Sequence, residues 1–171
     1  MLSIEKCSVP VNTLLDRYTR NGSYADCYRS EIPKQISLNQ FVLAFYTTSL
    51  FKLERFILNW TVSKPSTDSQ AMELVQGDID SFAAWNVEAR KDNELLMCDF
   101  GGRTRSWFMV NPINLSGGQT QLYFGSAVVP VRNPKTRELS IEFVYRVLLG
   151  FHQIYSVLLL QSAKTRVKRS M

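Results

Sequence analysis

The stretch VLLGFHQIYSVLLLQSA, residues Val147 to Ala163, contains no Asp, Glu, Lys or Arg. Its apolar side chains recur at helical spacing, which predicts a long and mostly buried helix near the end of the chain. A run of strand-like segments precedes it, and two aromatic-rich helical segments precede those strands. This order predicts an α+β fold in which a curved antiparallel sheet grips the C-terminal helix, an arrangement that often encloses a cavity.

The same stretch is too short and too polar for a good membrane span. A bilayer-spanning helix needs at least about 17 apolar residues, and this stretch only reaches that limit. His152, Gln153 and Ser156 interrupt its apolar character, and a basic cluster follows it. The sequence therefore predicts a helix buried in protein and no transmembrane segment.

The composition is typical of one globular domain. Of 171 residues, 45% are hydrophobic and 20% are charged, which suffices for a core and argues against disorder. We expect a single domain over residues 1–171, with an N-terminal extension over residues 1–23 and a basic tail over residues 164–171.

The formal net charge of +5 is concentrated in that tail, where Lys164, Arg166, Lys168 and Arg169 lie. The rest of the chain is close to neutral, so we expect no nucleic-acid partner. The tail is interpreted as a solvated helix end whose cations suit the negative end of the helix dipole. A weak peripheral contact with an anionic membrane is the alternative.

The cysteines and the single histidine predict neither a metal site nor a cofactor. Cys7, Cys27 and Cys98 are widely spaced, no C-x-x-C pair exists, and His152 does not complete a zinc site at recognisable spacing. The N-terminus has no apolar core of signal-peptide length. We therefore expect reduced thiols in a cytoplasmic protein.

Periodicity, caps and turn residues predict the individual elements. A capping box at Ser37 and Gln40 starts one helix, and a second begins near Leu50 with Leu53, Ile57 and Trp60 as its buried stripe. Thr67 or Asp68 caps a short third helix that ends at Gly77. The strands are expected at Tyr24 to Ile32, Ser81 to Arg90, Glu94 to Phe100, Arg103 to Val110 and Gln119 to Val131.

Two turns set the predicted register of the central strands. The Gly101-Gly102 hairpin places Met97 opposite Ser106 and Leu95 opposite Phe108. A three-residue turn at Lys91-Asp92-Asn93 places Ala89 opposite Leu95, Arg90 opposite Glu94, Val87 opposite Met97 and Trp85 opposite Asp99. The inner face is then expected to carry Trp85, Val87, Ala89, Leu95, Met97, Asp99, Thr104, Ser106 and Phe108. The other face is expected to carry Asn86, Glu88, Arg90, Glu94, Leu96, Phe100, Arg103, Arg105 and Trp107.

Asp99 is the one ionisable residue on this inner face, beside Trp85. A carboxylate on an apolar face is costly unless it is paired, so Asp99 is a candidate functional and catalytic group. The alternative is structural, because Asp99 lies next to the Gly-Gly turn and can bond to Thr104 or to the turn backbone. Arg103 and Arg105 are expected on the outer face, where they pair with Glu88 or stack on Trp107.

The C-terminal helix contributes two further candidates. His152 lies at the edge of an apolar stripe that includes Leu148 and Tyr155, and a lone histidine there is typically a hydrogen-bonded core or rim residue. Ser156 follows His152 by one helical turn, but two residues on one helix rarely form a nucleophile–base pair. The sequence contains no G-x-S-x-G motif, so it does not predict a hydrolase triad.

Several strings resemble those of a group of bacterial proteins related to the START-like, helix-grip superfamily. They are AFYTTSLFKLER, FAAWNVEAR with LLMCDFGGRTRSWF, LYFGSAV and LLGFHQIYS. That superfamily includes lipid-transfer domains, plant hormone receptors and polyketide cyclases, and it has no fixed catalytic motif. The resemblance covers about Tyr24 to Arg166 in element order, and it implies a cavity between sheet and last helix. The sequence departs from larger members in having fewer predicted strands.

These features predict a domain that binds a small, largely apolar or lipid-like ligand between the sheet and the C-terminal helix. The predicted ligand-binding residues are Trp85, Met97, Asp99, Ser106, Phe108, His152 and Tyr155. One alternative is an enzyme of the cyclase, dehydratase or isomerase type, with Asp99 as acid–base group and Tyr155 or His152 orienting the substrate. Another is a protein-interaction domain with a filled core and no ligand.

Overall fold

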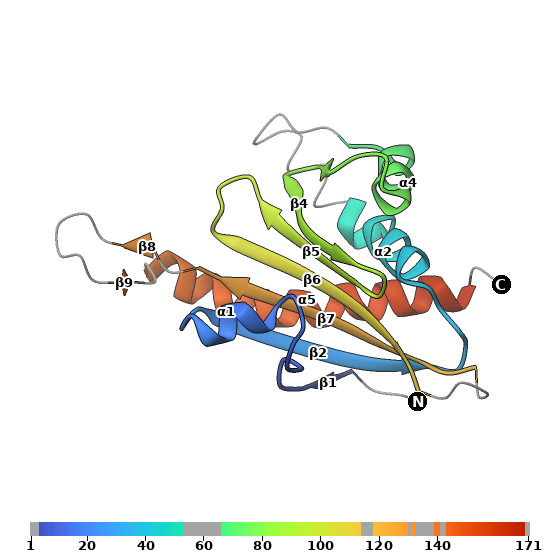
Figure 1. Ribbon diagram of the computed structural model, residues 1–171, viewed down its shortest axis with the longest axis horizontal. Helices are drawn as coiled ribbons and strands as arrows, with labels where there is room; N and C mark the ends of the chain where they lie inside the picture. Colours follow the sequence, from blue (N-terminus) through green and yellow to red (C-terminus); the bar gives the residue numbers. More distant parts are fainter. Residues whose placement is uncertain are drawn as a thin grey trace.

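The structure is a computed structural model that describes residues 4–52, 66–113, 118–129, 131–132, 139–140 and 143–169, with the backbone alone for residues 131–132, 139–140, 143–154 and 169. It is an α+β fold with one open antiparallel sheet (Figure 1). The sheet strands are β1 (Glu5–Lys6), β2 (Tyr24–Ile32), β3 (Ser81–Phe82), β4 (Trp85–Lys91), β5 (Glu94–Asp99), β6 (Thr104–Pro112) and β7 (Thr120–Val128). The helices are α1 (Asp16–Arg20), α2 (Leu38–Tyr46), α4 (Asp68–Gln76) and α5 (Phe143–Arg169).

The strand order across the sheet is β1-β2-β7-β6-β5-β4-β3. The short strands β8 (Val131–Arg132) and β9 (Leu139–Ser140) pair with each other apart from this sheet. The sheet has seven strands where the sequence predicted about five, and one of the two additional strands is β1, a two-residue edge strand too short for a periodic signal. The predicted strand at Ser81 to Arg90 is also divided, by a turn at residues 83–84.

Local capping residues start and end the helices as predicted. The Ser37 hydroxyl accepts a hydrogen bond from Gln40 N, and the Gln40 side chain accepts one from Ser37 N. Thr67 and Gln70 form a second capping box at the start of α4. Gly77 ends α4 with a φ of 87°, a left-handed conformation that suits glycine. These short-range bonds fix where the helices lie along the chain.

The register between β5 and β6 is the predicted one, and that between β4 and β5 is partly different. Met97 pairs with Ser106 and Leu95 with Phe108, as expected. A bulge between Val87 and Ala89 shifts the rest of β4, so that Lys91 faces Glu94 across a two-residue turn. The prediction of a three-residue turn was therefore wrong.

The bulge exchanges the faces of two side chains near that turn. Ala89 packs with the apolar cluster of the outer face rather than with the inner core. Arg90 reaches the inner side, where its guanidinium donates a 2.8 Å hydrogen bond to the Leu74 carbonyl near the end of α4. Both residues were predicted on the opposite face, because the prediction assumed an unbroken two-residue alternation.

The inner face of the sheet, covered by α2 and α5, carries the main core. Phe45 lies at the centre of this core, with its ring centroid 4.8 Å from those of Phe108 and Phe124. Tyr46 packs edge-on against Phe51 at 4.8 Å and lies 4.9 Å from Phe82. Aromatic rings therefore fill the part of the inner face beneath α2, with geometries typical of aromatic pairs.

The outer face is covered by residues 7–20, which we call the N-terminal cover. Leu15 is fully buried against Trp107, together with Leu96 and Tyr18. Glu94 anchors this cover, because its Oε2 accepts hydrogen bonds from Leu14 N at 2.7 Å and from Trp107 Nε1 at 2.8 Å. The face that was predicted to be the more polar one therefore carries a second hydrophobic core.

Some predicted features lie outside the described residues. They include the stripe Leu53, Ile57 and Trp60 and the side chain of His152, although α5 includes the backbone of His152. No helix in the described part of the chain is both long and apolar enough to cross a membrane.

Candidate functional site

Three polar side chains form a row across one end of the inner face, and we call them the polar row: Asp26, Ser126 and Ser106. Ser106 of β6 lies opposite Ser126 of β7, which lies opposite Asp26 of β2. The Ser126 hydroxyl donates a 2.5 Å hydrogen bond to Asp26 Oδ1. The three residues are only 3%, 1% and 9% exposed. Polar groups in such a place are costly unless they have partners, so the row is a candidate site.

The carboxylate of the polar row also affects its neighbour on β2. Burial, together with a smaller contribution from the negative charge of Asp26, raises the pKa of Tyr28 to about 12. Tyr28 is therefore a neutral phenol at physiological pH, able to donate a hydrogen bond but not to act as a base. Tyr28 and Asp26 share the inner face because they are two residues apart in one strand.

Five of the predicted ligand-binding residues lie on the inner face or at its edge. Met97 and Phe108 are fully buried in the core, and Ser106 belongs to the polar row. Trp85 and Tyr155 are half-buried and pack against the same core from β4 and α5. The structure thus brings these five residues to one face of the sheet. Trp85 and Tyr155 are the most solvent-accessible of the five.

Asp99, the predicted acid–base candidate, binds the backbone of the hairpin turn. Its Oδ1 accepts hydrogen bonds of 2.7 Å from both Arg103 N and Thr104 N. Its Oδ2 accepts a 3.1 Å hydrogen bond from Gly101 N. Three backbone donors on one half-buried carboxylate support the structural alternative that the sequence left open.

Ser156 of α5 is a second polar group on the covered side of the sheet. It is fully buried, and its hydroxyl has no hydrogen-bond partner within the described part of the structure. Buried hydroxyl groups are rarely left without a partner, so this oxygen is a candidate contact for a ligand or a water molecule.

The contact between α5 and β2 sets the level of Ser156 along the sheet. Lys164 Nζ donates a 2.5 Å hydrogen bond to Ser30 Oγ, and both elements run in the same direction across the sheet (Figure 1). Ser156 precedes Lys164 by eight helical residues, about 12 Å along the axis. Asp26 precedes Ser30 by four strand residues, about 13 Å. The serine of α5 and the carboxylate of β2 are therefore at a similar level.

Lys164 is buried, although it was predicted to lie in a solvated tail. It is 3% exposed, and burial lowers its pKa, with a further contribution from the positive charge of Lys168. The reason is helical geometry, because Lys164 shares the sheet-facing side of α5 with Leu160 and Val167, which are also buried. Arg166 and Lys168 are exposed, as predicted.

Arg105 lies on the outer face, as predicted. Its Nε lies 2.5 Å from Glu88 Oε2 and donates a 2.9 Å hydrogen bond to the Tyr18 hydroxyl. Tyr18 and Arg17 of the N-terminal cover also contact Glu88. The guanidinium of Arg105 stacks over the ring of Tyr18 rather than on Trp107.

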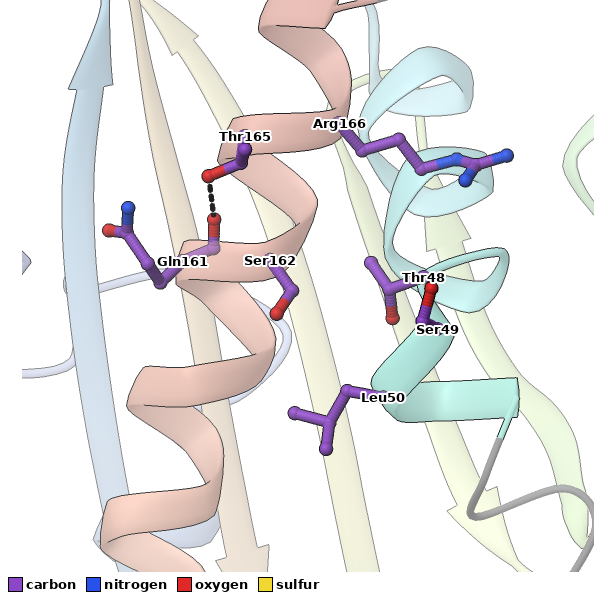
Figure 2. Close-up of a pocket in the computed structure, with 7 residues that line it drawn as sticks. All are labelled: Thr48, Ser49, Leu50, Gln161, Ser162, Thr165 and Arg166. Carbon is purple, nitrogen blue, oxygen red and sulfur yellow. Dashed lines mark hydrogen bonds between the residues drawn. The ribbon is translucent and has the colours of Figure 1, made fainter.

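A pocket of about 410 Å³ lies in the groove between α5 and the segment that follows α2. Figure 2 shows Ser162 and Leu50 extending into this groove, with Arg166 at its rim. Two of its hydroxyls already have local partners. Thr165 donates to Gln161 O at 2.8 Å, and Thr48 donates to Phe45 O at 2.9 Å.

Two further pockets also lie away from the predicted site. One of about 330 Å³ is lined by residues of α2, α4 and α5, including Leu43, Met72 and Val167. Another of about 240 Å³ lies beside the turn between β3 and β4. None of these three pockets is lined by a predicted ligand-binding residue.

The sequence analysis missed Asp26 and Ser126. Their signal lay in the two-residue alternation of β2, where Tyr28 and Ile32 are core residues and Asp26 shares their face. Ser126 likewise lies on the same face of β7 as Leu122 and Phe124. Extending the face assignment to these two strands would have found both residues.

Within the described residues, no group of three or more His, Cys, Asp or Glu side chains is arranged to hold a metal ion. Comparison with known proteins found no matching family model, no matching curated protein and no matching solved structure.

Proposed function

We propose that this protein binds a small, largely apolar ligand between the inner face of its sheet and α5. The observation that carries the proposal is the polar row, a buried carboxylate and two hydroxyls on a face that is otherwise apolar. Ligand sites commonly combine an apolar lining with a few polar groups that orient the ligand. The half-buried Trp85 and Tyr155 provide the edge by which a ligand enters.

The proposal includes membership of the helix-grip, START-like class. Supporting features are the antiparallel sheet, the helices inserted after its first long strand, and the 27-residue C-terminal helix on the same face. A further supporting feature is the pairing of β2 with β7, the last strand of this sheet in the chain. This pairing puts β2 and β7 side by side, and α5 contacts both strands.

The contacts of the polar row indicate the ligand's polar group. An ionised carboxylate only accepts hydrogen bonds, so Asp26 favours a ligand that donates one. The Ser156 hydroxyl can donate or accept. A long-chain alcohol or a similar hydroxylated molecule fits this pattern, whereas a fatty acid would bring a second negative charge towards Asp26. The packed rings around Phe45 limit the ligand to the end of the face that bears the polar row.

The enzyme alternative has less support from the structure. It assigned acid–base chemistry to Asp99, whose oxygens accept three hydrogen bonds from the turn backbone. A base must reach the proton that it removes, and these bonds hold the carboxylate towards the turn. Binding without turnover is therefore the function that the geometry favours.

The test compares an uncharged probe with its acid. Dodecanol and dodecanoic acid have similar chains, and calorimetric titration at neutral pH gives the affinity of each. We expect saturable binding, with the alcohol bound more tightly. Asp26→Asn should reduce this preference at least tenfold, because it removes the charge that disfavours the acid while the Asn oxygen can still accept from Ser126. An unchanged preference would contradict the proposed role of Asp26.

A second pair of variants locates the ligand. Ser106→Trp should fill the site and weaken dodecanol binding at least tenfold. Asn111→Trp is the matched control, because Asn111 is an exposed residue of the same strand. Equal binding by the folded Ser106→Trp protein would place the ligand elsewhere. Absence of saturable binding of either probe by the unmodified protein would overturn the carrier proposal and favour the interaction domain.

A further inference from the structure

Cys7 and Cys27 form a close pair of thiols at the edge of the sheet. β1 pairs with β2 through Glu5–Arg29 and Lys6–Tyr28, and the next pair in this register is Cys7–Cys27. Cys7 N donates a 2.9 Å hydrogen bond to Cys27 O, and the two Sγ atoms are 3.4 Å apart. Both are free thiols in this structure.

The backbone geometry is compatible with a disulfide bond. Directly opposite residues of antiparallel strands have Cα atoms roughly 4.5 to 5.5 Å apart. Disulfides span Cα distances of about 4.4 to 6.8 Å, so bond formation requires only a rotation of the side chains. Cys7 lies just after the two-residue strand β1, where a small adjustment disturbs few hydrogen bonds.

The two thiols have different surroundings. Cys27 is fully buried, whereas Cys7 is half-buried. The hydrogen bond with Cys27 holds the pKa of Cys7 below its usual value, and the nearby Arg29 acts in the same direction. That hydrogen bond and burial raise the pKa of Cys27. Cys7 is thus the accessible thiol with more thiolate character, and Cys27 lies behind it.

We propose that Cys7 and Cys27 are a peroxide-reactive site in which Cys7 is oxidised first and Cys27 then closes an intramolecular disulfide. The Cys7 thiolate attacks one oxygen of a hydroperoxide, the O–O bond breaks, and Cys7 becomes a sulfenic acid as the other oxygen leaves and takes up a proton. Cys27 then attacks the Cys7 sulfur, and the sulfenic oxygen leaves as water. Two thiols and one molecule of hydrogen peroxide yield one disulfide and two molecules of water.

The disulfide would fasten the N-terminal cover to the sheet. The two cysteines are twenty residues apart, and the chain between them includes Leu15 and α1, which pack on the outer face. Closing such a loop restricts the unfolded chain and therefore stabilises the folded one. Oxidation at this site would hold the cover in place, and reduction would release the restraint.

The experiment treats the full-length protein with a small molar excess of hydrogen peroxide and then removes the oxidant with catalase. Thiol titration should show the loss of two of the three cysteine thiols. Mass spectrometry should show the loss of two hydrogen atoms, and peptide mapping should find Cys7 linked to Cys27. Thermal denaturation should show a melting temperature a few degrees higher, which dithiothreitol returns to its original value.

Single variants separate this site from the third cysteine. Cys98→Ser should react as the unmodified protein does, because burial raises the pKa of Cys98 and makes it less reactive. Cys7→Ser should consume peroxide at least tenfold more slowly. Reaction of Cys7→Ser at the unmodified rate, or disulfides that join separate chains or include Cys98, would overturn the proposal. A Cys7–Cys27 disulfide that leaves the melting temperature unchanged would overturn the role proposed for the N-terminal cover.

Discussion

Leu15 lies directly over Gly125, and no side chain fits between them. A Cβ atom on Gly125 would be 2.6 Å from Leu15 Cδ2, 2.9 Å from the Asp26 carbonyl oxygen and 3.1 Å from the ring of Trp107. Gly125 of β7 therefore leaves the space in which the N-terminal cover packs on the outer face. The absent side chain permits the close approach of a second layer.

Gly125→Ala should destabilise the fold by about 1–3 kcal/mol, because the added methyl group overpacks a well-filled interface. Urea denaturation measures this change in the free energy of unfolding. The cost should be smaller in a Leu15→Ala background, where the nearest clashing atom is absent. Equal costs in both backgrounds would show that Leu15 is not the residue that excludes the methyl group.

Asp99→Asn should destabilise the protein by about 1–2 kcal/mol and leave dodecanol binding unchanged. The substituted amide nitrogen cannot accept the hydrogen bond from Gly101 N, and the charge that strengthens the other two bonds is lost. Asp92→Asn, at an exposed turn residue, is the control for a change of charge. Weaker ligand binding with unchanged stability would restore the functional interpretation of Asp99.

Glu94→Gln should destabilise the protein by about 1–3 kcal/mol, because a buried carboxylate that accepts two bonds at one oxygen becomes a neutral amide. The affected bonds come from Leu14 N and Trp107 Nε1, so the N-terminal cover should loosen first. Hydrogen exchange of the Leu14 amide should become faster in the variant. An exchange rate equal to that of the unmodified protein would contradict the anchoring role.

Lys164 should make stability depend on alkaline pH. Its pKa is lowered by folding from an ordinary value of 10.5, so the unfolded chain binds more protons between the two pKa values. Stability should therefore rise with pH in that window, because the cost of holding a buried charge disappears. Lys164→Met should lack this rise relative to the unmodified protein.

Lys6→Met is the matched control, because Lys6 is an exposed residue of β1 whose charge does not contribute to the pKa shift of Lys164. Urea denaturation of the three proteins between neutral pH and pH 10.5 gives the comparison. Parallel pH profiles for all three would show that the burial of Lys164 has no energetic consequence.

Local patterns predicted the elements and the face of the central hairpin. The capping boxes at Ser37 and Thr67 are formed by residues three positions apart, and the pairing of Met97 with Ser106 follows from the turn that joins their strands. Those interactions depend on short loops, so the sequence nearby suffices to specify them. The three predicted residues Met97, Ser106 and Phe108 share the inner face for this reason.

Other features depended on contacts between distant parts of the chain. Asp26 and Ser126 are one hundred residues apart, and no local turn indicates that β2 pairs with β7. The bulge after Val87 could not be predicted from the nearby sequence, because it depends on how β4 packs within the whole sheet. A single extra residue changes the face of the side chains between it and the turn. The candidate site could therefore be predicted only in the half that belongs to one hairpin.

The sequence by itself determined where the longer helices and strands of the described part of the chain form, because periodicity, caps and turns act over a few residues. Only the tertiary structure decided what lies on each face. The N-terminal cover has no clear period, and its place depends on Gly125 and Glu94, which are distant in sequence. The same long-range packing brings Cys7 to Cys27 and buries Lys164 against β2, since burial depends on which surfaces meet and not on any one segment.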